Sequence, residues 1–176
     1  MSTLATNTTE ASTLAPDIAR LAGVISSPRY PGGDHAALRR WAPGLSVPLA
    51  FYRLWLRYLD RELPPEGDTE AWMTIAWGIA ISGEGCHDPK HPLGQAFAES
   101  GYSEGRLERL LSAPEDVRID LFMTAVRFLA TKGKRFDWRE ATQFLLTRDA
   151  DKRENLHRRI ASAYFHHLPP KSSAKE

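Results

Sequence analysis

Apolar residues recur every three or four positions over most of the chain, with polar residues between them. The clearest run lies in residues 49–63, where the recurring apolar positions are Leu49, Tyr52, Leu56, Leu59 and Leu63. The same spacing returns in residues 121–129 and in residues 156–167. This period is typical of helices that bury one face, whereas the alternation of half-buried strands is scarce. The sequence therefore predicts an all-α fold, a compact bundle of about seven to nine helices.

Composition along the chain separates a central domain from two tails. Residues 1–15 are rich in Thr, Ser and Ala, and residues 169–176 are polar, so both are predicted to be disordered. Residues 16–168 are predicted to form the helical domain. A division of this domain into two small lobes, 16–111 and 112–168, stays open.

Two short motifs predict where helices begin. Ser112 is followed three positions later by Glu115, and Asp137 by Glu140. Both pairs match an N-terminal capping arrangement, in which a side-chain acceptor precedes a glutamate by three residues. Gly83–Pro92 is predicted to be a long loop because it holds four glycine and proline residues and few apolar residues.

Composition places the chain among ordinary globular proteins, with 42% hydrophobic and 26% charged residues. Cys86 is the single cysteine, so no intrachain disulfide can form, and a reducing compartment is expected. The first ten residues lack the basic and apolar regions of a signal peptide. The longest apolar stretch, Ile75–Ile81, is too short to cross a bilayer. We therefore expect a cytoplasmic protein without a membrane partner.

Charge is distributed unevenly, although the whole chain carries only +1. Residues 1–126 hold 11 Lys and Arg against 16 Asp and Glu, a net charge of −5. Residues 127–176 hold 12 against 6, a net charge of +6. A chain divided in this way can present a basic surface locally.

Arginines also interrupt the apolar helical segments of the N-terminal two thirds, at Arg39, Arg40, Arg53, Arg57, Arg61, Arg106 and Arg109. Spacings of three and four predict that Arg53, Arg57 and Arg61 form one basic stripe, and that Arg106 and Arg109 share a face. Like charges at this spacing repel unless an anion lies beside them. Because the guanidinium group matches phosphate geometry, nucleic acid is the first partner to consider.

The C-terminal basic residues allow two interpretations. On a helix starting near residue 148, one side of the apolar face carries Arg148, Lys152 and Arg159, the other side Arg153, and the back Arg158. A solvated helix with i,i+4 pairs to Asp149 and Glu154 would explain them. A basic loop ahead of it, with Lys132, Lys134 and Arg135, favours an anion-binding surface instead. Such a surface contacts phosphate and reads no sequence.

Catalytic and cofactor motifs are absent from the sequence: it has no P-loop, dinucleotide-binding, zinc-protease or nucleophile-elbow signature. Cys86, His87, Asp88 and His91 could contribute to a zinc site, but a second ligand cluster is missing, which favours a polar loop. The five tryptophans, Trp41, Trp55, Trp72, Trp77 and Trp138, could stack on bases, but their apolar surroundings favour core packing. We expect no enzyme, no metal and no cofactor.

Five segments, in order, resemble one family. They are Gly33–Arg40 (GDHAALRR), Val47–Leu54 (VPLAFYRL), Pro92–Gly101 (PLGQAFAESG), Arg106–Ala113 (RLERLLSA) and Phe136–Trp138 (FDW). Together they are similar to the CasB family, the small subunit of the type I-E CRISPR surveillance complex called Cascade. The resemblance covers roughly residues 30 to 168.

The resemblance implies an all-helical, non-catalytic prokaryotic protein. Members lie as a pair of copies along the belly of the complex, beside the subunits that hold the CRISPR RNA. Their basic surface helps to hold the target strand and the displaced strand when the RNA–DNA hybrid opens the duplex. Matching positions in this chain are Arg39, Arg40, Arg53, Arg106, Arg109 and Arg127. The implied partners are other Cascade subunits, CRISPR RNA, both DNA strands and a second copy of the chain.

This chain departs from the family at positions that are often basic, where it has Gln95, Met123 and Thr124. The departures shift the expected strand-binding surface toward residues 132–159. The candidate nucleic-acid-binding residues are Arg39, Arg40, Arg53, Arg57, Arg106, Arg109, Arg127, Lys132, Lys134, Arg135, Arg148, Lys152, Arg153 and Arg159. The alternative is a helical adaptor whose arginines contact acidic protein surfaces.

Overall fold

The computed structural model describes residues 6–170, with side chains from Leu14 onward, and it confirms the all-α prediction. In chain order the α-helices are α1 (Thr6–Ile25), α2 (Gly32–Arg40), α3 (Leu49–Arg53), α4 (Thr69–Ser82), α5 (Leu93–Glu99), α6 (Glu104–Leu111), α7 (Glu115–Thr131), α8 (Trp138–Leu146) and α9 (Ala150–His167). A π-helical turn, η1 (Leu54–Tyr58), continues α3, and a 3-10 turn, η2 (Glu66–Asp68), precedes α4. These nine α-helices of the described chain agree with the predicted number, and an isolated bridge between His87 and Phe136 is its one β-type pairing.

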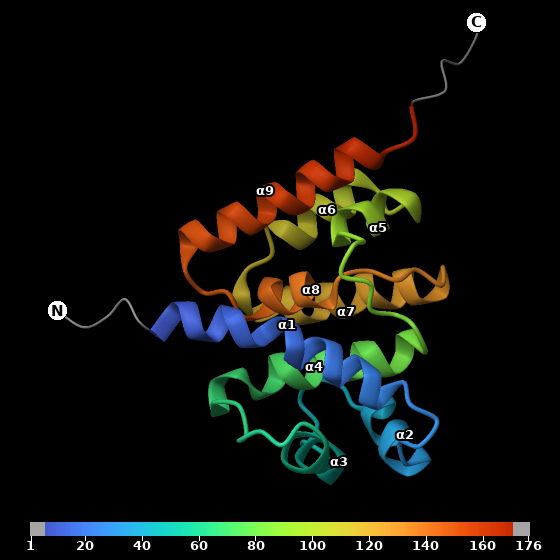
Figure 1. Ribbon diagram of the computed structural model, residues 1–176. Helices are drawn as coiled ribbons and strands as arrows, with labels where there is room; N and C mark the ends of the chain where they lie inside the picture. The colour runs from blue at the N-terminus through green and yellow to red at the C-terminus, as the bar shows by residue number, and fades with distance from the viewer. Residues whose placement is uncertain (1–5, 171–176) are drawn as a thin grey trace, which may run out of the picture.

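The helices lie in successive layers, which Figure 1 shows from top to bottom. The upper layer holds α9 with α5 and α6, the middle holds α7 and α8, and α1 and α4 follow, with α2 and α3 at the lower end. One cluster of buried apolar residues connects them, from Ile18 in α1 to Tyr164 in α9. The helix α9 is therefore an integral part of the core, and its outer face is held in a fixed position.

Two glycines allow the closest helix contacts. A Cβ built on Gly94 of α5 would collide with the carbonyl oxygen of Ile160, so α5 lies directly against the backbone of α9. A Cβ on Gly78 of α4 would come within 2.5 Å of the Trp138 ring of α8. Any side chain at either position would push the two helices apart.

The N-terminal segment differs from its prediction, because α1 begins at Thr6 whereas a disordered tail was expected over residues 1–15. Leu14 lies one turn before the buried Ile18 and packs against the same core, which extends the helix into the polar segment. Residues 1–5 of that predicted tail lie outside the described residues. At the other end α9 stops at His167, residues 169 and 170 are not helical, and residues 171–176 also lie outside the described residues.

The helix predicted over residues 49–63 is much shorter than expected. Regular α-helix stops at Arg53, and the chain continues as a π-turn to Tyr58. Asp60 then adopts a positive φ of 53°, and the Arg61 N–H donates to the Trp55 carbonyl, six residues back. Because wide turns change the angular spacing of side chains, Arg53, Arg57 and Arg61 do not form the predicted stripe.

The two predicted helix starts have different outcomes. Asp137 caps α8 as expected, with its carboxylate accepting from the Arg139 N–H at 2.9 Å. The Ser112 prediction is wrong. Ser112 ends α6, where its hydroxyl donates to the Glu108 carbonyl at 2.7 Å, and α7 starts after Pro114.

Candidate nucleic-acid interface

A groove of about 930 Å³ runs along one side of α9, facing α1, α8 and the beginning of α4. Three cationic side chains of α9 line it: Lys152, Arg158 and Arg159. Arg148, from the turn between α8 and α9, lines the same groove. Four basic side chains that lie within 12 residues of sequence are thus brought to one concave surface.

The amphipathic character of α9 places these side chains. Leu156, Ile160 and Tyr164 are buried, and the Tyr164 hydroxyl donates to the Tyr102 carbonyl at 2.7 Å. Asp149 caps the helix by accepting from the Lys152 N–H at 2.9 Å. With the inner face fixed in this way, polar residues beside the buried row project toward α1 and α8.

Lys152 and Arg159 line the groove on the side of α9 that the sequence predicts for them. Arg148 lines it from the turn before the helix, because α9 starts at Ala150 and not near residue 148. Arg158 was expected at the back of the helix but lines the groove as well, one turn after Asn155. A long arginine side chain reaches the groove from the edge of the helix, which a helical projection of Cβ positions does not capture.

Three carboxylates also line the groove, and each already has a partner. Asp17 accepts from Arg61 at 2.8 Å, Asp68 accepts from Arg148 at 2.8 Å, and Asp149 is the cap of α9. By contrast, Lys152, Arg158 and Arg159 have no carboxylate within 4.0 Å among the residues that the structure describes. Arg159 donates instead to the Gln143 side chain at 3.1 Å. Among the described residues, the groove therefore holds three cations that make no ion pair with a carboxylate.

Arg53, by contrast, is exposed but already has an anionic partner in the fold. Its Nε and Nη2 donate to Asp34 at 3.0 and 2.5 Å, and Asp34 is only 8% exposed. The hydrogen bond to Asp34 raises the pKa of the guanidinium above its ordinary value. Arg53 therefore joins α3 to α2 and is already neutralised.

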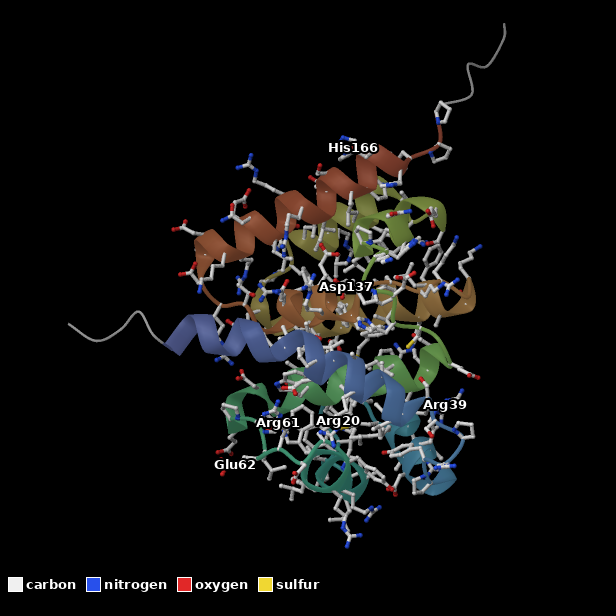
Figure 2. The ribbon with its side chains drawn as sticks, in the orientation of Figure 1. Arg20, Arg39, Arg61, Glu62, Asp137 and His166 are labelled. Atoms are coloured by element: carbon white, nitrogen blue, oxygen red, sulfur yellow. The ribbon has the colours of Figure 1, made fainter. Side chains whose placement is uncertain are left out.

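The remaining N-terminal candidates are exposed. Arg39 and Arg40 lie in the last turn of α2, where a positive charge is favourable beside the helix dipole. Arg57 lies in η1. Figure 2 shows Arg39 and Arg61 on opposite sides of the lower part of the molecule, with His166 at the far end of α9. Arg39, Arg40 and Arg57 do not line the groove, whereas Arg61 reaches its edge through Asp17.

A second basic patch forms where α6 meets the end of α7. Arg106 and Lys132 both lie over the Phe128 ring, 5.8 and 5.7 Å from its centroid. Arg109 lies on the same helix as Arg106, and Arg127 covers the Trp77 ring at 4.9 Å. Lys132 thus belongs with the α6 arginines and lies at the opposite end of α8 from Arg148.

The other basic candidates have local partners or lie apart. Lys134 contacts Glu99 at 3.5 Å, and Arg135 is exposed in the same loop before α8. Arg153 donates to the Thr147 carbonyl at 3.1 Å, on the side of α9 where Arg118 is buried. The expected surface over residues 132–159 is therefore divided between the ends of α8, because that helix separates its two halves.

The fold already uses the segment that contains Cys86, His87, Asp88 and His91, through core packing and hydrogen bonds. Cys86 is buried, which raises the pKa of its thiol to about 11. The Nδ1 atom of His87 accepts from the Trp138 N–H at 3.2 Å, and His91 contacts Glu99 at 3.1 Å. Within residues 6–170 no group of three or more His, Cys, Asp or Glu side chains is arranged to hold a metal ion.

The tryptophans confirm the core interpretation at four positions. Trp41, Trp55, Trp77 and Trp138 are buried. Trp72 is only partly buried and lines the groove, which the sequence did not distinguish because nearly every position around α4 is apolar.

No protein-family model, no curated protein and no solved structure matches this chain. Among the helices described, none combines the length and the hydropathy that crossing a bilayer requires. The family resemblance therefore stays a prediction from sequence.

Proposed function

We propose that this chain is a non-catalytic small subunit of a type I-E CRISPR surveillance complex, acting in the cytoplasm of a prokaryote. Within the complex it binds nucleic-acid backbone without reading sequence and stabilises the DNA strands that separate when the guide RNA pairs with its target. The observation that carries the proposal is the groove of α9, where Lys152, Arg158 and Arg159 lack carboxylate partners among the described residues.

The charge of the groove supports a phosphate ligand. Unneutralised cations in a concave surface attract a polyanion and release its counterions on binding. The side chains come from one rigid helix, so they contact a backbone without forming a base-reading arrangement. Sequence recognition would then come from pairing between guide and target.

Neutralising the groove tests the proposal. The variant Lys152→Gln, Arg158→Gln, Arg159→Gln should weaken retention of target DNA by the reconstituted complex. It should also lower the slope of log affinity against log salt by about 2, at about 0.7 per lost single-strand phosphate contact. The readouts are a filter-retention assay over a salt series and co-purification of the complex with small RNA.

A matched control removes the same charge elsewhere. Arg20, Arg29 and Lys90 are exposed and lie outside the groove, so changing all three to Gln should leave the salt slope unchanged. Equal retention and equal slopes for the groove variant and the control would overturn the proposal.

A protein-adaptor role is the second candidate, and exposed leucines favour it. Leu49 is 70% and Leu56 51% exposed, and Arg57 is exposed beside them on the α3–η1 segment. Apolar side chains alternating with arginine are typical of protein interfaces. In the same co-purification, Leu49→Ser with Leu56→Ser should reduce assembly with other subunits if this surface is an interface, while DNA binding by the free chain stays unchanged.

A further inference from the structure

Trp72 differs from the other tryptophans because it is only partly buried and lines the groove. It lies in the first turn of α4, directly after η2, and only part of its surface is buried against the core. A large aromatic side chain beside unneutralised cations combines the two elements that bind single-stranded nucleic acid, a stacking platform and a basic track.

Aromatic side chains of the core support the Trp72 ring. Its centroid lies 4.9 Å from that of Trp55, with the rings inclined at 66°, an edge-to-face contact. Trp55 in turn stacks on Phe51 at 5.3 Å. The indole is therefore supported by the core and needs little reordering to receive a ligand.

Polar groups line the same groove as Trp72. Arg148 is fixed next to the start of α4 by bonds to Asp68 at 2.8 Å and to the Gly67 carbonyl at 3.1 Å. Gln143 from α8 and Asn155 from α9 also line the groove. Amide groups donate and accept hydrogen bonds; the Gln143 carbonyl accepts from Arg159 at 3.1 Å, and its NH2 group is a further donor in the groove.

We propose that the groove seats one unstacked nucleobase on the ring of Trp72, while Lys152, Arg158 and Arg159 bind the flanking phosphates. The occupant is then a single strand, because bases in a duplex are stacked on their neighbours and cannot reach the ring. A volume of about 930 Å³ is at the upper end of the range for small-molecule sites, sufficient for a base with its sugar and phosphates. This inference rests on the proposed function and adds a base contact to a backbone contact.

Fluorescence measures the contact directly, because the other four tryptophans are buried. The full chain is titrated with single-stranded DNA, single-stranded RNA, and a DNA oligomer of equal length whose central nucleotides are abasic. Base-containing strands should quench tryptophan emission. The abasic strand should bind roughly 5- to 150-fold more weakly and quench little, since it keeps the phosphates and lacks the stacking partner.

Variants of Trp72 separate the loss of the ring from a general effect on the fold. Trp72→Phe should keep most of the affinity and lose the quenching, and Trp72→Ala should lose both. Phe165→Ala is the matched control, because this aromatic residue of α9 is 54% exposed and lies outside the groove. The Phe165 variant should bind and quench like the parent chain.

The result distinguishes this inference from the function on which it rests. Equal affinity for abasic and normal strands, or undiminished quenching in Trp72→Phe, overturns the base contact, while salt-dependent binding that needs Lys152 and Arg158 still supports the function. Absence of salt-dependent binding to any strand overturns both. Base-dependent quenching by DNA, by RNA or by both supports the inference and identifies the strand that occupies the groove.

Discussion

The groove of α9 and the α3–η1 segment both carry several basic side chains within a short stretch of chain, but the structure uses them differently. In the groove, Lys152 and Arg158 extend beside a partly exposed tryptophan and contact no carboxylate in the described part of the chain. On α3, Arg53 is bound to the buried Asp34, and exposed leucines lie around it. The two places differ in whether the fold supplies an anion, as Asp34 does for Arg53. The comparison separates cations without an ion-pair partner among the described residues from a cation that the fold has already paired.

The largest expected effect comes from disturbing the helix that builds the groove. Gly94→Ala places a Cβ against the Ile160 carbonyl, so α5 and α9 must separate. We expect a loss of at least about 3 kcal/mol in the free energy of unfolding, the upper end for overpacking. Chemical denaturation measures this, and strand binding should fall with it.

Gly105→Ala is the control for the previous variant, since a Cβ at that helical position meets nothing within 4 Å. It should leave stability unchanged or slightly higher because alanine favours helix. A Gly94→Ala protein as stable as the parent would contradict the close contact between α5 and α9.

An intermediate effect on stability is expected from the Asp34–Arg53 ion pair, which joins α3 to α2. Asp34→Ala removes the carboxylate that Arg53 contacts and should lower the free energy of unfolding, because α2 and α3 lose the ion pair that joins them. Lys152→Gln, by comparison, should change stability by less than about 0.5 kcal/mol. Urea unfolding compares the two. An equal loss of stability in the two variants would contradict the view that Arg53 has a structural role and Lys152 does not.

The smallest effect concerns pH. Burial lowers the pKa of His157 on α9 and of His35 on α2 below their ordinary value of 6.5. The folded chain then keeps these rings neutral while the unfolded chain takes up protons, so stability falls as pH decreases through 6.5. The urea midpoint should decrease from about pH 7.5 to about pH 6, and less so in His157→Gln. A midpoint that rises over this interval would contradict the burial of these rings.

The sequence predicted the architecture and one side of the groove, because both depend on local periodicity. Leu156, Ile160 and Tyr164 define the buried face of α9, and that face determines where Lys152 and Arg159 project. The cap at Asp137 is equally local.

Features that join distant parts of the chain could not be predicted in this way. The Arg53–Asp34 pair connects residues 19 apart, and the π-turn at Leu54–Tyr58 rotates side chains away from their helical positions. The accessibility of Trp72 depends on which part of α4 the other helices leave uncovered. Each of these features depends on tertiary packing, which the local pattern of a single sequence does not reveal.

Because Cys86 is buried, the chain is suitable for site-specific chemical labelling. It is the only cysteine in the sequence, and a thiol pKa of about 11 leaves almost no reactive thiolate near neutral pH. A cysteine introduced at Asn155, on the rim of the groove, would therefore be alkylated selectively without removing the native thiol. Photo-crosslinkers or spin labels attached there would report on whatever strand or subunit passes along α9.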